Sequence, residues 1–133
     1  MSSENWWKEL VYTTFLESGI RKQDLDDKFS PLFDSLYARF MTKEGYSLFP
    51  DVITTLDELK ERGFKMGVIS NSDERLISVM ESLKLDQYFE FILPSRLAGY
   101  EKPAPEIFQK AIHLIDEPIH IDEALHVGDD VEK

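Results

Sequence analysis

The sequence predicts an α/β protein built on a parallel sheet and preceded by a small helical segment. From about residue 50 onward, helical patterns alternate with short apolar runs in the order helix, strand, helix, strand, helix, strand. Polar residues follow the predicted strands, and ligands of such sheets bind beyond the carboxyl ends of the strands. The alternation therefore predicts the fold class, and the polar strand ends predict where function resides.

Residues 1–44 are predicted to be a helical unit with broad apolar faces. Ser3 is expected to cap the first helix, and Gly19 is expected to stop it. A unit of this size has a small core and is expected to pack on something else. The predicted helices cover residues 3–18, residues 23–29 and a stretch that starts with Ser30 as cap and Pro31 in the first turn.

Residues 45–133 are predicted to form the sheet and its helices. The first helix opens after Pro50 and ends at Gly63. Asn71 is expected to cap the next helix, with Glu74 completing a capping box. The apolar runs predict strands at Lys65–Ser70, Phe89–Leu93 and Glu123–Gly128, and the last helix is expected to start at Pro105.

Composition excludes several classes of protein. The 133 residues carry 26 acidic against 15 basic side chains, a net charge of −11, so no basic surplus serves nucleic acid or anionic membranes. The chain has no Cys, which excludes disulfides and thiolate metal sites and favours an intracellular, cytoplasmic location. No apolar run has the length of a membrane span, and no secretory signal is evident. Composition leaves the oligomeric state open.

Two adjacent carboxylates, Asp129 and Asp130, end the string LHVGDD after the last predicted strand. Neighbouring carboxylates repel each other and resist burial, and a hard cation such as Mg²⁺ neutralises them. The pair is therefore a candidate metal site. The alternative is an Asp-rich turn, since Gly and Asp are common turn residues.

Ser70 and Asn71 follow the apolar residues of the first predicted strand. A hydroxyl at a strand end, next to the free N–H groups of a helix start, can bind an anion. Both residues are candidates for substrate binding. Simple helix capping is the alternative, and the two roles are compatible.

Lys102 lies in the string GYEKPAP, between Gly99 and two prolines. A stiff loop delivers its lysine to a fixed place, where the ammonium group would stabilise both carboxylates and a phosphate. The alternative is a lysine that is simply solvated at the surface.

Together, VISN, GYEKPAPEIF and LHVGDD resemble the second, third and fourth motifs of the haloacid dehalogenase superfamily of hydrolases, most of which are phosphatases. The resemblance implies an incomplete Rossmann-like core with part of a helical cap in residues 1–44. It implies a Mg²⁺ cofactor and a phosphorylated small-molecule substrate. The implied roles are catalysis and substrate binding for Ser70 and Lys102, substrate binding for Asn71, and metal binding for Asp129 and Asp130.

The nucleophile of that superfamily is an Asp in a DxDxT motif on the first strand, and this sequence contains no DxDxT. A complete relative would form an aspartyl-phosphate. This chain is therefore expected to be an inactive fragment of a magnesium-dependent phosphatase. The strand that bears the motif would lie between the first and third predicted strands, so a gapped or re-paired sheet and a marginal fold are expected.

Two further interpretations remain open. One is a noncatalytic binding or interaction protein that is derived from such a hydrolase. The other is a receiver-like signalling domain, which also gathers acidic residues, a Ser or Thr and a Lys around a parallel sheet. The GYEKPAPEIF loop and the helical segment do not suit the receiver interpretation.

Overall fold

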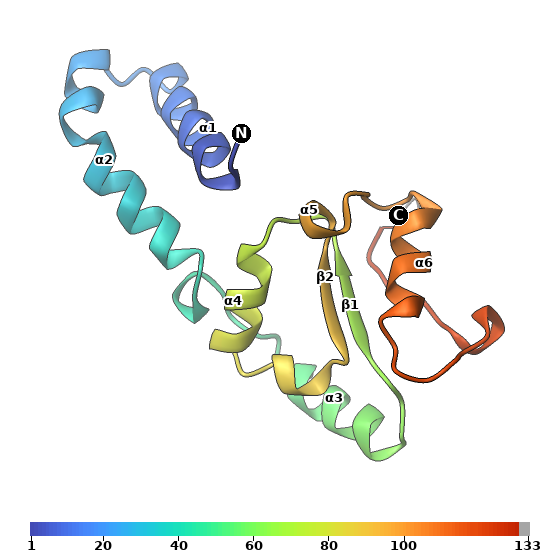
Figure 1. The fold of residues 1–133 in the computed structure, drawn as a ribbon. Helices are drawn as coiled ribbons and strands as arrows, with labels where there is room; N and C mark the ends of the chain where they lie inside the picture. Colours follow the sequence, from blue (N-terminus) through green and yellow to red (C-terminus); the bar gives the residue numbers. More distant parts are fainter. Residues whose placement is uncertain (131–133) are drawn as a thin grey trace. The chain divides into compact units, whose positions relative to one another are not determined.

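The computed structural model describes residues 1–130 of the chain. The chain divides into two compact units, Met1–Tyr46 and a second unit that begins at Ser47. Figure 1 shows helices in the first unit, and two strands with their flanking helices in the second. Among the described residues, no helix has the length and apolar character needed to cross a membrane.

The first unit is a pair of helices, α1 (Ser3–Glu17) and α2 (Lys22–Arg39). Ser2 caps α1, because its hydroxyl accepts a hydrogen bond from the Asn5 N–H at 3.2 Å. The cap therefore lies one residue before the predicted Ser3.

Helix α2 is continuous, so the prediction of separate helices at residues 23–29 and from Ser30 is wrong. Pro31 lies inside the helix, although proline removes one backbone hydrogen bond there. Leu25, Phe29 and Phe33 recur every four residues on both sides of the proline, and all three are buried. Burying one uninterrupted apolar face against α1 offsets the lost hydrogen bond. The α1 side chains around this core include Trp7, Val11, Tyr12, Phe15 and Leu16.

The second unit follows the predicted alternation in its first two strands. Gly63 ends the first helix with a positive φ of 82°. A short helix, which the sequence pattern did not predict, follows the second strand directly. The elements are α3 (Val52–Glu61), β1 (Gly67–Ser70), α4 (Arg75–Ser82), β2 (Phe91–Pro94), α5 (Ser95–Ala98) and α6 (Pro105–His113), with 3-10 turns at Lys43–Gly45, Asp86–Tyr88 and Ile121–Glu123.

The sheet of the described residues has two parallel strands, with Gly67 opposite Phe91 and Ser70 opposite Pro94. Figure 1 shows α4 on one side of the strands and α6 on the other. Ile107 of α6 is fully buried in a core cluster. A two-stranded sheet is marginal alone, so cover by helices stabilises this one. The cluster comprises Leu93, Ala98, Ile107 and Ala111, with Ile69, Phe91 and Phe108 packed against it.

The third predicted strand, Glu123–Gly128, does not form. Residues 124–128 have no regular secondary structure, and Leu125 and Val127 are 89% and 82% exposed. An isolated strand lacks partners for its backbone groups, and none of the described strands pairs with this segment. Of the two expected outcomes, a gapped or a re-paired sheet, the described residues show neither strand pairing at the third position nor re-pairing of the third predicted strand with the first. An edge-on contact between the rings of His126 and Phe108, 5.1 Å between centroids, links the segment to α6.

An ion pair joins the residues just before β1 to the loop that follows α6. The Lys65 Nζ lies 2.9 Å from the Glu117 Oε2. This hydrogen bond lowers the pKa of Glu117 and raises the pKa of Lys65. Both side chains are solvated, so the pair contributes little to stability.

The Phe91 ring packs closely against Gly67. A Cβ atom at Gly67 would stand only 2.1 Å from the Phe91 Cζ. We expect Gly67→Ala to destabilise the second unit by about 1–3 kcal/mol through overcrowding. In a Phe91→Leu background, the same change should cost less, since leucine lacks the ring's far end. A double-mutant cycle by urea denaturation measures this coupling. Additive losses would contradict the packing described here.

Among the described residues, the β1 backbone pairs with β2 on one side, and its other side has no strand partner. We therefore expect β1 amides that point away from β2 to exchange rapidly with solvent in the isolated monomer, while the middle of α6 exchanges more slowly. Hydrogen exchange followed by NMR measures both, after sedimentation has confirmed the monomer. Strong protection at every amide of Lys65–Ser70 would show that the sheet has no open edge there.

Candidate functional site

The carboxyl ends of the two strands lie side by side, because Ser70 is opposite Pro94 in the register. Figure 1 shows both strands ending at the same edge of the sheet, where the loop before α6 also passes. Ser70 is partly buried at the end of β1. The fold thus places the first predicted site residue at the edge where parallel sheets bind ligands.

Asn71 connects the end of β1 to the Lys102 loop. Its Nδ2 donates to the Lys102 carbonyl oxygen at 2.9 Å, and its Oδ1 accepts from the Lys102 N–H at 2.7 Å. The structure therefore brings Ser70, Asn71 and the Lys102 backbone together, although 31 positions separate Asn71 from Lys102. The nitrogen and the oxygen of the Asn71 side-chain amide each satisfy one backbone group of Lys102, so the two hydrogen bonds fix the position of the Lys102 backbone.

The predicted capping box is wrong. Helix α4 begins at Arg75, its cap position is Glu74, and no side-chain cap hydrogen bond forms there. Asn71 lies too far upstream, and its side chain is engaged by Lys102. A residue that looks like a helix cap in the sequence is instead a link between two loops.

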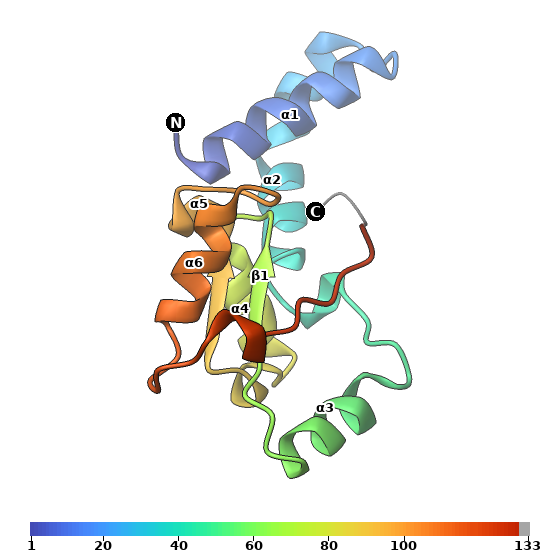
Figure 2. The ribbon, with the colours of Figure 1, turned by 90° about the vertical axis from the view of Figure 1, so that its right-hand side faces the viewer.

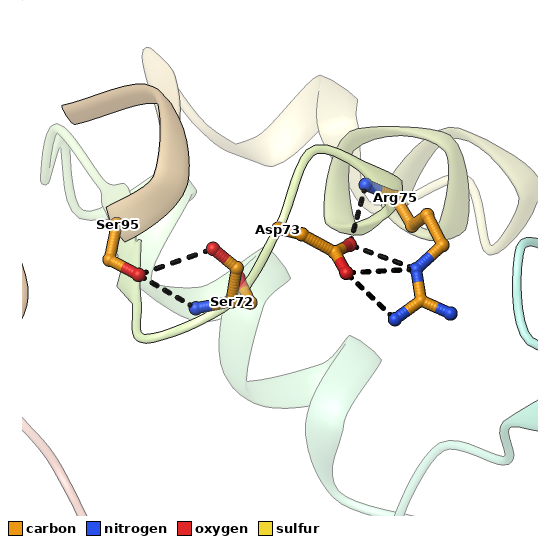
Figure 3. Close-up of polar contacts among 4 residues, drawn as sticks. All are labelled: Ser72, Asp73, Arg75 and Ser95. Carbon is orange, nitrogen blue, oxygen red and sulfur yellow. Dashed lines mark hydrogen bonds and ion pairs between the residues drawn. The ribbon is translucent and has the colours of Figure 1, made fainter. Parts of the chain in front are cut away.

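Ser95 joins the loop after β2 to the loop after β1 (Figure 3). Its Oγ accepts from the Ser72 N–H at 3.1 Å and donates to the Ser72 carbonyl oxygen at 3.2 Å. The Arg96 N–H also donates to that carbonyl oxygen, at 3.1 Å. Ser95 was not among the predicted site residues, although a polar residue directly after the second strand was a usable signal.

Asp73 and Arg75 form an ion pair where the loop turns into α4 (Figure 3). The Arg75 Nε and Nη2 lie 2.9 and 2.8 Å from the two carboxylate oxygens, and the side chains are 15% and 14% exposed for Asp73 and Arg75. The Asp73 Oδ1 also accepts from the Arg75 backbone N–H at 3.1 Å. Sequence periodicity gave no signal for this pair, because Asp73 lies in the loop before α4 and Arg75 is the first residue of the helix.

Asp129 and Asp130 lie in the exposed segment after the missing third strand. Figures 1 and 2 both show residues 124–130 running toward the edge at which β1 and β2 end. Within residues 1–130, no three acidic or histidine side chains are gathered as a metal site. The two carboxylates still suit Mg²⁺ in kind, since Mg²⁺ is often held by one or two carboxylates together with phosphate and water.

An open groove of about 490 Å³ lies elsewhere on the second unit. Leu97 and Tyr100 line one part of it, and Lys110 and His113 of α6 line another. None of the predicted site residues lines this groove, so its chemistry is separate from theirs.

Comparison with solved structures defines the class of fold. A dehalogenase whose crystal structure holds an intermediate complex matches with a TM-score of 0.63, at 23% identity, over 83% of this chain and 45% of that one. The sequence defines the family, because residues 1–132 match the family model for haloacid dehalogenase-like hydrolases. The chain belongs to this family.

Relatives within the family show the same pattern of coverage. Haloacid dehalogenase-like hydrolase domain-containing protein 3 of Xenopus laevis is 39% identical over 130 residues, 98% of this chain and 51% of the relative. The rhythmically expressed gene 2 protein of Drosophila melanogaster is 36% identical, over 97% of this chain and 51% of the relative. A phosphoglycolate phosphatase of Rhodobacter capsulatus is 30% identical, over 78% and 48%. The chain spans about half the length of these relatives.

Replacing Asn71 tests the link between the loops. We expect Asn71→Ala to lower the free energy of unfolding by about 1–2 kcal/mol, because two hydrogen bonds to the Lys102 backbone are lost. The Lys102 amide resonance should shift and its hydrogen should exchange faster. Urea denaturation and NMR measure these effects, with exposed Asn5→Ala as the matched control. An unchanged Lys102 amide would contradict the link.

Proposed function

We propose that this chain carries the phosphoryl-binding part of a phosphatase site. The observation that carries the proposal is the pair of hydrogen bonds from Asn71 to the Lys102 backbone, which ties Lys102 to the strand end that bears Ser70. Membership of the haloacid dehalogenase-like hydrolases supports it, as does similarity to a phosphoglycolate phosphatase.

In this proposal the Ser70 hydroxyl donates a hydrogen bond to one phosphoryl oxygen, and the Lys102 ammonium group neutralises another. Charge-assisted hydrogen bonds to phosphate are stronger than neutral ones. Asn71, at the start of the same turn, also contributes to binding of the phosphoryl group. Since the chain has a net charge of −11, a local positive charge is needed to offset the repulsion of an anion at this end of the sheet.

Asp129 and Asp130 are the residues that would hold Mg²⁺. The metal would supply positive charge between a bound phosphoryl group and the nearby carboxylates. The two aspartates follow Gly128, and their segment runs toward the same edge of the sheet. Within the described residues, this pair is the donor set that the motif resemblance assigns to the metal.

The reaction that we propose for the longer relatives is attack by an aspartate carboxylate on the phosphorus, which breaks the phosphate ester bond, releases the alcohol and gives an aspartyl-phosphate. Water then hydrolyses this intermediate to inorganic phosphate and the free aspartate. No DxDxT occurs among the 133 residues. The aspartates before β1 lie in or at the start of helices α2 and α3, not after a strand. We therefore propose that this chain binds phosphoryl groups of small molecules without hydrolysing them by itself.

A phosphatase assay tests the catalytic half of the proposal. With para-nitrophenyl phosphate and Mg²⁺, the 133-residue chain should show no turnover above buffer, and Asp129→Ala should show none either. Magnesium-dependent activity that Asp129→Ala abolishes would overturn the view that the chain lacks a nucleophile.

Binding of inorganic phosphate tests the other half. In an NMR titration at constant ionic strength, the amides of Ser70, Asn71 and Lys102 should shift together as phosphate is added. Lys102→Ala should weaken binding about tenfold or more, because a charge-assisted hydrogen bond is lost. Lys28→Ala, at an exposed position of α2, is the matched control and should leave binding unchanged. Absence of binding by the unmodified chain would favour an interaction protein with no phosphoryl site.

A further inference from the structure

The Ser95 hydroxyl occupies a point between two functional loops. It accepts from the Ser72 N–H and donates to the Ser72 carbonyl oxygen, so one oxygen atom satisfies both backbone groups of one residue. Figure 3 shows Ser95 at the start of α5, facing the Ser72 backbone across the gap between the loops. We infer that Ser95 is a positioning residue for the phosphoryl-binding turn, an inference that rests on the proposed function.

The two hydrogen bonds between Ser95 and Ser72 act at the middle of the turn that follows β1. Ser72 lies two residues after Ser70 and directly after Asn71, whose side chain is held by the Lys102 backbone on the other side. Fixing the Ser72 peptide therefore fixes the orientation of the turn that presents Ser70. The Ser72 hydroxyl is buried and has no hydrogen-bond partner among the described residues. At this residue, the backbone holds the turn.

Ser95 is itself well anchored. It follows Pro94, which is fully buried and opposite Ser70 in the strand register. At the far end of α5, the Lys110 Nζ donates to the Ala98 carbonyl oxygen at 2.6 Å. The anchored helix α5 therefore holds the Ser95 hydroxyl in a fixed place. A fixed hydroxyl is what is needed to orient the Ser72 backbone.

A hydroxyl suits this place better than the other small polar groups. It donates and accepts at once, whereas a carboxylate only accepts and would add negative charge near a bound phosphate. Alanine would leave the Ser72 N–H without its acceptor. Threonine keeps the hydroxyl, and position 95 is only partly buried, so its methyl group can be accommodated.

The test compares inorganic phosphate binding by the unmodified chain, Ser95→Ala and Ser95→Thr in the same NMR titration. We expect Ser95→Ala to weaken binding about fivefold or more, and Ser95→Thr to restore it to within about twofold of the unmodified chain. The Ser72 amide should shift in Ser95→Ala and return toward its original position in Ser95→Thr. Ser47→Ala, at an exposed position of the same unit, is the matched control.

The outcomes separate this inference from the proposed function. If the unmodified chain binds phosphate through Ser70 and Lys102 and Ser95→Ala binds equally well, Ser95 does not position the turn and the proposed function stands. If the unmodified chain does not bind phosphate, both fail. If Ser95→Ala unfolds the second unit, Ser95→Thr decides: weak binding by a folded Ser95→Thr chain overturns the role of the hydroxyl, and near-normal binding supports it.

Discussion

The hydrogen bonds to two consecutive residues, Asn71 and Ser72, hold the candidate site together. Asn71 binds the Lys102 backbone through its side chain, and Ser72 binds Ser95 through its own backbone. Three loops that are distant in sequence are thereby joined at one edge of the sheet. The roles proposed for Ser70 and Lys102 depend on these neighbours, because a side chain can act on a ligand only if its backbone has a fixed place.

The sheet beneath the site is small, and the helices compensate for its size. Two four-residue strands provide few ladder hydrogen bonds, so most of their stability comes from burial against the flanking helices. Ile107 and Ala111 of α6 pack against one face of the sheet. The Phe91 ring occupies the space that a side chain at Gly67 would need. Within residues 1–130, the two strands can thus present their carboxyl ends side by side although no third strand pairs with them.

Local patterns predicted the elements that local forces decide. The helix after Pro50, the first two strands and the helix from Pro105 were found because periodicity and turn residues agree there. The break at Pro31 was wrong, since burial of Phe29 and Phe33 on one face outweighed the proline. The third strand was wrong because a strand depends on a neighbour that its own residues do not specify. The site residues came from motifs. The bonds between Ser95 and Ser72 are a product of tertiary structure, whereas the Asp73–Arg75 pair depends on the local conformation just before α4.

The uncovered side chains of Leu125 and Val127 also bear on how the protein behaves at high concentration. Apolar groups in an extended segment attract those of other molecules, and long-range repulsion between like-charged molecules opposes this attraction. With a net charge of −11 and an isoelectric point of about 4.6, the repulsion is strong at neutral pH and vanishes under mild acid. Colloidal stability is therefore tied to pH and ionic strength, and low-salt neutral buffers suit concentrated samples best.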